Sequence, residues 1–352
     1  MTALYNSAQQ HFTNGDDVAG RADLRALIAA DPHDTEALAL HAIRSHYAGD
    51  TAAVGDALTR LGGLDPAMAA GTHDRFAPKT VGRARDNQRM SSSVLADVVG
   101  ALRRAGCVFA EDEAALLLDA AAGDQHRLDA LVGQRVSGTP LEYLLGWVEF
   151  RGMRVRVRPG VFVPRQRTAF LVEQAVIATT ATRVCMVDLC CGCGALGLSA
   201  TTELTARGCA VELVAADIDP VAVACARENL AALHAPVFGG DLFDALPGDL
   251  RGRVDLLLAN TPYVPSARVA QLPPEAREYE PLVALDGGED GLDVFRRVAA
   301  GAAQWLAPGG RVLVEIGAGQ VETACAVLTA HGLASRVARS RDHYATVVIG
   351  TP

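Results

Sequence analysis

From about residue 168 onward, apolar runs of strand length alternate with stretches that have the pattern of helices. The runs VCMVDLC, VELVAADI, VDLLLAN and GRVLVEIG are mostly apolar, and helical stretches such as DPVAVACARENLAALH lie between them. Nearly continuous apolar strands are typical of a parallel sheet that helices cover on both faces. We therefore predict an α/β fold with a doubly wound, mostly parallel sheet over residues 168–352. The final run, HYATVVIGTP, predicts a last strand that could lie antiparallel at the edge.

The residues before this region have a different pattern. Apolar residues recur at helical spacing in ADLRALIAA and TEALALHAI, and the pair Asp-Pro occurs at positions 31 and 65, a spacing that is typical of tetratricopeptide-like hairpins. This extension could be a repeat-like interaction or dimerisation module, or it could pack on its own chain. The expected divisions are a helical extension at 1–72, a polar linker at 73–92, a small helical domain at 93–145, a β-hairpin connection at 146–167 and the α/β domain at 168–352.

Charge and composition exclude several classes of protein. The 41 acidic and 32 basic residues give a formal net charge of −9, which argues against a surface that binds nucleic acid non-specifically. No apolar run approaches the roughly 18–20 residues that span a bilayer, and the N-terminus lacks the features of a signal peptide. The eight cysteines are sparse, and the three at 190, 191 and 193 have no second pair at metal-ligand spacing. We expect a cytoplasmic protein without a metal site, a membrane contact or a nucleic-acid partner.

The first strand-to-helix turn of the α/β region is rich in glycine. In VDLCCGCGALGLSA, Asp188 ends a strand, and Gly192, Gly194 and Gly197 follow as a helix begins. Glycines at this place let the backbone approach a ligand closely at the N-terminus of a helix. Dinucleotide enzymes use similar loops, so this turn alone predicts only a cofactor site.

Two acidic residues follow the next two strands. Asp217 ends the second strand, where a carboxylate can bind the hydroxyls of a ribose. Asp241 follows the third element, where the acid or its backbone could meet an adenine amino group. The spacing of both acids after the glycine loop predicts a nucleoside-containing cofactor.

The fourth strand ends in a turn with the sequence Asn260-Thr261-Pro262-Tyr263. The Asn260 side chain offers a carbonyl acceptor, and a rigid turn can aim the backbone carbonyl of Thr261 beside it. Two acceptors next to an aromatic ring suit a planar NH2 group. An Asx-turn that merely closes the strand is the structural alternative, and the preceding glycine loop and acids favour the functional interpretation.

These features together resemble an S-adenosylmethionine (SAM)-dependent methyltransferase, and in particular the protein-glutamine methyltransferases that modify peptide chain release factors. Further matches are GTPLEYLLG at 138–146, EF at 149–150, VPR at 163–165, and the stretches EYEPLVALDGGEDGLDVFRRV and LAPGGRVLVEIG. The resemblance covers roughly residues 93–350, and the first 72 residues lie outside it.

The resemblance implies a class I, Rossmann-like methyltransferase fold, SAM as cofactor, and methyl transfer to a glutamine amide of a release factor. It implies that the turn at 260–263 is catalytic and that the cofactor site contains Cys190, Ile218 and Leu242, besides Asn260 and the loop residues and acids named above. Residues expected to bind the substrate are Phe162, Pro164, Arg165, Arg167 and Thr168. The acceptors of the catalytic turn would stabilise the positive charge that develops on the nitrogen.

Three departures from the usual family pattern concern the site. Thr261 replaces a proline of the turn, Arg167 replaces an acid and reverses its charge, and Cys190 stands where a glycine is usual. The same cradle could take a guanidine nitrogen, whose charge would need a carboxylate. Candidate carboxylates are Glu275, Glu278 and Glu280.

Three functions therefore stay open at this point. The leading prediction is a release-factor glutamine methyltransferase. The alternatives are a methyltransferase for a small amino-acid-like molecule such as free arginine, and a non-catalytic SAM-binding scaffold. A homodimer could form through residues 1–72.

Overall fold

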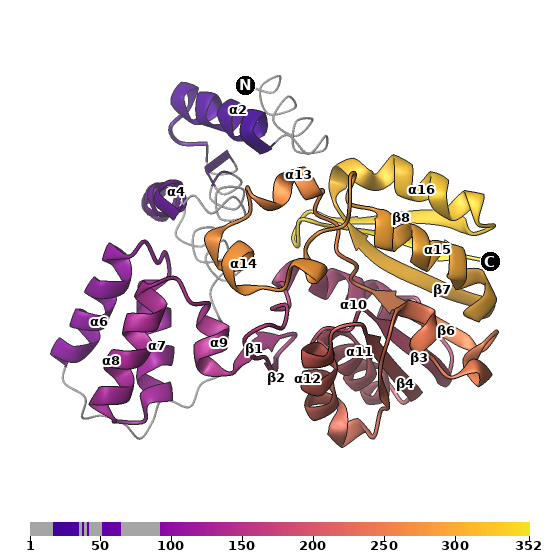
Figure 1. Cartoon of the computed structure of the whole chain (residues 1–352). Helices are drawn as coiled ribbons and strands as arrows, with labels where there is room; N and C mark the ends of the chain where they lie inside the picture. The colour runs from indigo at the N-terminus through magenta and orange to yellow at the C-terminus, as the bar shows by residue number, and fades with distance from the viewer. Residues whose placement is uncertain (1–16, 35–36, 39–40, 42–50, 65–91) are drawn as a thin grey trace. The chain divides into compact units, whose positions relative to one another are not determined.

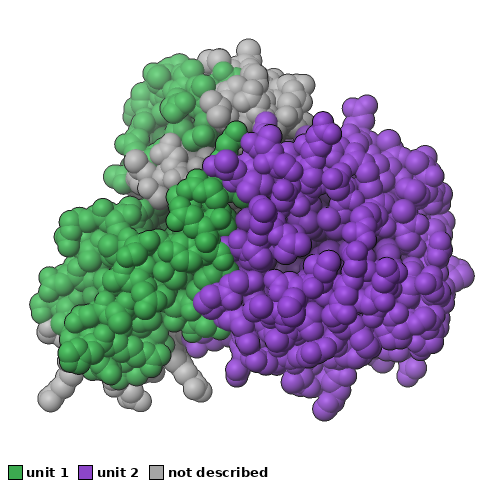
Figure 2. Space-filling model, viewed as in Figure 1, with its two compact units in different colours: residues 1–146, 271–279 green, residues 147–270, 280–352 purple. Residues whose placement is uncertain are grey.

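The computed structural model describes residues 17–34, 37–38, 41, 51–64 and 92–352. The chain forms two compact units, which Figure 2 distinguishes by colour. Unit 1 comprises residues 1–146 together with 271–279, and unit 2 comprises residues 147–270 and 280–352. Nearly all of the expected linker at 73–92, and the second Asp-Pro pair at 65, lie outside the described residues.

Unit 2 is built on a seven-stranded sheet with the order β5-β4-β3-β6-β7-β9-β8. Strands β3 to β7 are parallel to one another, and β9 is antiparallel to both β7 and β8. The strands are β3 (Arg183–Leu189), β4 (Ala210–Asp217), β5 (Val237–Gly239), β6 (Val254–Ala259), β7 (Leu306–Ile316), β8 (Ala334–Ser340) and β9 (Ala345–Thr351). The doubly wound, mostly parallel α/β fold is confirmed. The last strand is antiparallel, but it lies between β7 and β8 and not at the edge.

Helices cover both faces of this sheet. Figure 1 shows α15 (Asp293–Trp305) and α16 (Val321–Ala330) on one face, and α10 (Ala169–Ile177), α11 (Ala195–Ala206) and α12 (Pro220–Leu230) on the other. Alternate residues of β3 pack against α15: Val187 and Leu189 share a buried cluster with Phe295. Because side chains alternate along a strand, Asp188 and Glu315 project from the opposite face.

Smaller elements complete unit 2. Strands β1 (Trp147–Phe150) and β2 (Met153–Arg156) form an antiparallel hairpin. The short helix η1 (Gln166–Thr168) leads into α10, and α13 (Ser266–Val269) follows β6. Helix η1 reappears below because its Arg167 contacts Tyr263, one of the residues predicted to be catalytic.

Unit 1 is helical. The helices of its described residues are α2 (Asp17–Ala30), α4 (Thr51–Leu64), α6 (Ser92–Arg104), α7 (Ala110–Ala121), α8 (Gln125–Val136), α9 (Leu141–Leu145) and α14 (Pro274–Tyr279). Helix α8 begins where the Asp124 side chain accepts a hydrogen bond from the Arg127 N–H at 3.1 Å. Leu102, Leu117 and Leu128, one from each of α6, α7 and α8, are fully buried. None of the helices in the described ranges is long and apolar enough to cross a membrane.

An ion-pair network attaches residues 271–279 to the helices of unit 1. Arg135 on α8 donates to Glu113 on α7 and to Glu275 on α14, each at 2.6 Å. The Tyr143 hydroxyl donates to the backbone carbonyl of Tyr279 at 3.4 Å. Unit 1 is therefore assembled from two stretches of chain that are far apart in the sequence.

Candidate functional site

The carboxyl ends of four neighbouring strands meet at one edge of the sheet. Leu189, the last residue of β3, lies beside Ala216 of β4 and Ala259 of β6. Asp217 ends β4 next to the last residue of β5. The glycine loop, Asp217 and Asn260 therefore start from the same edge, beside the point where strand order reverses between β3 and β6. Ligands of doubly wound sheets bind at this point.

The glycine loop after β3 takes a left-handed backbone at several positions. Gly192 and Gly194 have φ values of 55° and 80°, and Cys190 has a φ of 53°. At Cys190, which carries a β-carbon, such a backbone costs roughly 1–2 kcal/mol. A β-carbon at Gly192 would meet no atom within 4 Å, whereas one at Gly194 would lie 3.2 Å from Leu230. The loop thus has open space on one side, at the N-terminus of α11.

Asp188 lies beneath this loop and is fully buried. Its Oδ2 accepts the Gly197 N–H at 2.8 Å, and no donor in the described part of the chain reaches Oδ1. Burial raises the pKa of Asp188 to about 8. A β-carbon on Gly197 would lie 3.0 Å from the carboxylate, so this glycine permits the close packing of α11 on β3.

Asp217 is held in place by two backbone donors. Its Oδ2 accepts the Gly192 N–H at 2.8 Å, and its Oδ1 accepts the Asp219 N–H at 2.9 Å. Burial raises the pKa of Asp217, and these two hydrogen bonds oppose that rise. Because a carboxylate has about four acceptor positions, the oriented group keeps capacity for the two hydroxyls of a ribose.

Other predicted cofactor residues lie after β4 and β5. Asp241 forms an ion pair with Arg297 of α15 at 2.7 Å, a partner that the sequence did not indicate. Ile218 exposes 54% of its surface, and Leu242 is buried with a φ of 48°. An exposed isoleucine next to an oriented carboxylate fits an aromatic ring carried by a ribose.

Three observations within unit 2 indicate that the residues at this edge of the sheet fit SAM. The space beside Gly192 is open, the Asp217 carboxylate is oriented by backbone donors, and Asp188 has an acceptor atom that no described group reaches. A glycine loop, an oriented acid and an apolar neighbour are the elements that a nucleoside-linked cofactor requires.

The predicted catalytic turn follows β6 directly. The Asn260 Oδ1 is buried, and no hydrogen-bond donor among the described residues reaches it. Thr261 is 1% exposed, and its hydroxyl oxygen likewise lacks a partner in the described residues. Both are buried polar atoms, and a donor brought by a ligand would satisfy an acceptor of this kind.

Tyr263, at the end of the turn, is held through its hydroxyl. The hydroxyl donates to Glu315 Oε1 of β7 at 3.3 Å and accepts a hydrogen bond from Arg167. Arg167 Nε also donates to Glu315 Oε1 at 3.0 Å. Burial raises the pKa of Tyr263 to about 12, so the hydroxyl is protonated near neutral pH. Glu315 is not among the site residues predicted from the sequence.

A loop at 285–291 forms backbone hydrogen bonds with the residue that follows the turn. The Val264 N–H donates to the Leu285 carbonyl at 3.1 Å, and the Gly287 N–H donates to the Val264 carbonyl at 2.8 Å. The amide of Gln320, which precedes α16, donates to the Tyr263 carbonyl at 3.0 Å. The backbone of the turn is therefore fixed by segments from two later parts of the chain.

Two glycines in this loop have no room for a side chain. A β-carbon on Gly287 would approach the Pro262 carbonyl to 2.5 Å, and one on Gly291 would lie under 3 Å from the Tyr263 carbonyl. Gly291 also has a φ of 79°. Close contact with the turn at 260–263 explains why glycine occupies both positions.

The residues predicted to bind substrate separate into groups. In unit 2, Arg165 forms an ion pair with buried Glu280 at 2.5 Å and lies 4.8 Å from the centre of the Phe162 ring. Pro164 and Thr168 are buried, so they contribute to the packing of this segment. The role of these residues toward a substrate stays a prediction.

Glu275 and Glu278 belong to unit 1. Glu275 accepts from Arg135, and Glu278 forms an exposed ion pair with the adjacent Arg277 at 2.9 Å. The three glutamates proposed as a carboxylate set therefore do not form one cluster within a unit: only Glu280 belongs to the unit that contains the catalytic turn.

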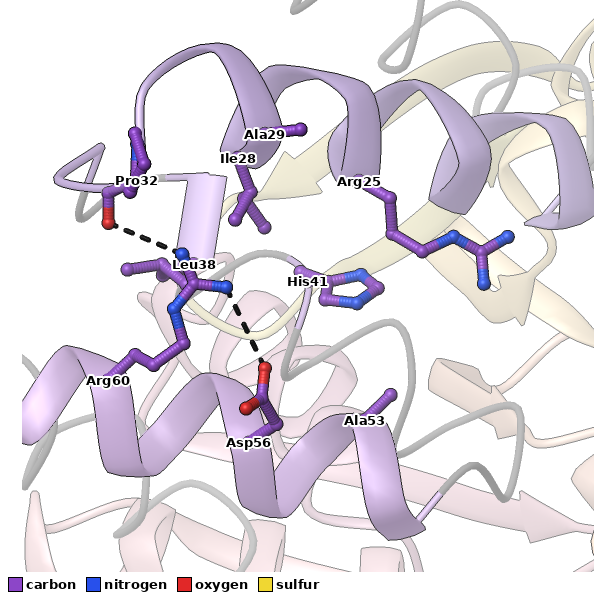
Figure 3. Close-up of a pocket in the computed structure, with 9 residues that line it drawn as sticks. All are labelled: Arg25, Ile28, Ala29, Pro32, Leu38, His41, Ala53, Asp56 and Arg60. Carbon is purple, nitrogen blue, oxygen red and sulfur yellow. Dashed lines mark hydrogen bonds and ion pairs between the residues drawn. The ribbon is translucent and has the colours of Figure 1, made fainter.

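Two other features of the described residues do not involve the predicted site. A hollow of about 390 Å³ lies between α2 and α4 of unit 1, where Arg60 reaches toward the Pro32 carbonyl and Asp56 (Figure 3). No group of three or more His, Cys, Asp or Glu side chains in the described ranges could hold a metal ion.

Comparison with known proteins gives consistent matches. Residues 152–272, which include the glycine loop, Asp217 and the turn at 260–263, match the model of the family "Methyltransferase small domain". The release factor glutamine methyltransferase of Geobacter sulfurreducens is 38% identical over 204 residues, which are 57% of this chain and 69% of that protein. The enzyme of the same name from Streptomyces coelicolor is 40% identical, over 53% of this chain and 65% of that protein.

Among solved structures, a ribosomal protein L11 methylase from Lactobacillus delbrueckii subsp. bulgaricus is 15% identical, with a TM-score of 0.41. The match covers 56% of this chain and 84% of that one. The relatives named above are covered over about two thirds of their own length.

Proposed function

Because the chain belongs to the family of release factor glutamine methyltransferases, we propose that it methylates the side-chain amide nitrogen of a glutamine in a peptide chain release factor. The predictions of a SAM-dependent methyltransferase and of its class I fold are confirmed. A release factor as substrate implies that the reaction takes place in the cytoplasm. The small-molecule acceptor and the homodimer through residues 1–72 stay hypotheses without support from the relatives.

The observation that carries this proposal is the buried Oδ1 of Asn260. No donor in the described part of the chain satisfies it, although a buried acceptor without a partner costs roughly 1–3 kcal/mol. It stands at the carboxyl end of β6, directly beside the strand that leads into the glycine loop. The N–H of a planar amide placed next to the cofactor would satisfy this atom.

The chemical problem is the weak nucleophilicity of an amide nitrogen, whose lone pair is delocalised. SAM, when bound by the glycine loop and Asp217, supplies an electrophilic methyl group on a sulfonium. Asn260 Oδ1 and the backbone carbonyl of Thr261 would accept the two amide N–H groups and orient the nitrogen toward that methyl. The same oxygens would stabilise the positive charge that develops on nitrogen as its bond to the methyl forms and the methyl–sulfur bond breaks, before one N–H proton is lost to water.

Tyr263 and its partners would hold these two acceptor oxygens in a fixed position. Its hydroxyl is fixed between Arg167 and Glu315, and its backbone carbonyl is fixed by Gln320. Preorganised acceptors lose no free energy to reorientation during the reaction. The turn is thus suited to a planar, uncharged nitrogen.

The direct test is to incubate the full chain with SAM and a purified release factor and to map the product by mass spectrometry. We expect the mass of one methyl group to be added to a single glutamine. A release factor with alanine at that glutamine should gain none. Methylation of free amino acids together with an unmodified release factor would refute the proposal.

A further inference from the structure

Two ion pairs flank Tyr263 within unit 2. Arg167 pairs with Glu315 at 3.0 Å, and Arg165 pairs with Glu280 at 2.5 Å. The glutamate side chains are 3% and 2% exposed, whereas the arginines are 25% and 33% exposed. Each buried carboxylate is thus matched by one guanidinium that reaches it from the segment before α10.

These charges act on the catalytic turn itself. The Tyr263 hydroxyl contacts both members of the first pair. Burial has the largest effect on the pKa of Tyr263, and the charges of Arg167, Glu315 and Arg165 also influence it. The acceptor nitrogen, bound at the other residues of the turn, would therefore experience the field of both pairs.

The Glu315 carboxylate is incompletely hydrogen-bonded by the described residues. Glu315 Oε1 receives donors from Arg167 and Tyr263, but its Oε2 is buried without a partner among the described residues. The carboxylate consequently depends on one cation for compensation. Loss of that cation would leave a buried, uncompensated negative charge.

We propose that the two pairs keep the acceptor site electrically neutral, and that Arg167 and Glu315 thereby select an uncharged amide over a charged side chain of similar shape. This inference rests on the proposed function, and it assigns both residues a role in specificity. Glutamate is the hardest competitor to exclude by shape, since its carboxylate has the shape of the glutamine amide. Discrimination between such groups requires an unfavourable interaction with the wrong one, and a neutral, largely desolvated site provides it because charge is costly to bury there.

The opposite signs of the two side chains allow a paired test. R167Q removes the cation and leaves Glu315, and E315Q removes the anion and leaves Arg167. Calorimetry would measure the affinity of each enzyme, with S-adenosylhomocysteine present, for three release factors that carry glutamine, glutamate or arginine at the methylated position.

For E315Q we expect the affinity for the glutamate form, relative to the glutamine form, to rise at least tenfold, since Arg167 is then uncompensated. For R167Q the arginine form should gain at least tenfold relative to the glutamine form. In the double variant R167Q/E315Q both ratios should return to within about threefold of the wild-type values. A general structural disturbance would not reverse its effect with the sign of the ligand.

R253Q is the matched control. Arg253 pairs with Glu212 at 3.4 Å in the same unit, next to the start of β6 and thus at the opposite end of that strand from the turn. Its removal should leave all three affinities unchanged.

Wild-type ratios in both folded single variants would overturn the inference. If circular dichroism shows that R167Q does not fold, E315Q decides alone. The charge that E315Q leaves uncompensated is a partly exposed arginine and not a buried carboxylate. An unchanged affinity ratio for the glutamate form in E315Q refutes the inference. If the wild-type enzyme does not methylate the glutamine form at all, the proposed function fails instead, and the two failures are distinguishable.

Discussion

The buried Oδ1 of Asn260 has no hydrogen-bond donor among the described residues. Removal of this oxygen should affect the chemical step and not the binding of the cofactor. Asn260→Ala should lower kcat for release-factor methylation by roughly a hundredfold or more, the scale of losing one preorganised group at the reacting centre. The dissociation constant of SAM, measured by calorimetry, should change less than about threefold. Near-normal turnover would remove Asn260 from the catalytic role.

Thr261 gives a matched comparison in the same turn. Its backbone carbonyl is the proposed acceptor, whereas its hydroxyl oxygen is buried without a partner in the described residues. Thr261→Val keeps the carbonyl and the side-chain shape, so kcat should stay within a few-fold of the wild type. Stability in urea should be unchanged or slightly higher, because an unsatisfied polar group is lost. A large fall in kcat would show that the hydroxyl itself takes part.

Asp188 should make stability depend on pH. Burial raises its pKa from 3.8 to about 8 in the folded protein, so between about pH 4 and pH 8 the folded state holds a proton that the unfolded state has released. The free energy of unfolding contributed by this group therefore falls as the pH rises through that window and is constant beyond it. Urea denaturation at pH 5, 6.5 and 8 should show that Asp188→Asn reduces this fall. Parallel pH profiles for both proteins would contradict the assignment.

At the scale of elements, the loop at 285–291 positions the turn proposed to be catalytic through glycines that contact it. Gly291→Ala places a β-carbon against the Tyr263 carbonyl, so we expect kcat to fall at least tenfold with little change in SAM affinity. Gly332→Ala is the control, since Gly332 has a similar φ of 75° but no atom within 4 Å of a β-carbon. Both substitutions impose a backbone cost of about 1–2 kcal/mol. Equal kcat values in the two variants would mean that the loop does not hold the turn.

The elements also differ in how well their own sequences indicate them. The apolar strands β3, β4, β6 and β7 were predicted because they are buried on both faces. Strand β8 is mostly exposed at the edge, and its sequence ASRVARS has no regular apolar–polar alternation, so it carries little strand signal. β9 was expected at the edge, and it is instead covered by β8.

At the scale of the whole molecule, Arg135 links two distant stretches of chain within unit 1. Its side chain is 9% exposed and compensates Glu113, which is 8% exposed. Arg135→Gln should therefore destabilise unit 1 by about 3–5 kcal/mol, the usual cost of breaking a buried ion pair. Hydrogen exchange should localise this effect to α7, α8 and α14 and leave the strands of unit 2 protected.

Arg103→Gln is the control for that prediction. Arg103 and its partner Glu111 are 62% and 58% exposed, so the pair should contribute only about 0–1 kcal/mol. Similar losses for the two substitutions would show that the buried network contributes no more than a surface pair.

What the sequence determined by itself is local. The period of the strands, the glycines at 192, 194 and 197, Asp217 and the turn at 260–263 are each contained in a few consecutive residues. Parallel strands bring their carboxyl ends to one edge, so the position of the candidate site follows from strand order alone.

Only the tertiary structure decided which groups complete that site and that helical unit. Arg167 meets Glu315 across 148 positions, Arg135 meets Glu275 across 140, and Gln320 reaches Tyr263 across 57. No local pattern encodes such pairs, because a buried charge takes whichever partner the packing of distant elements brings within hydrogen-bond distance. The sequence marked Arg167 and Glu275 as charges for a substrate, and the fold pairs each of them with a buried charge of its own chain.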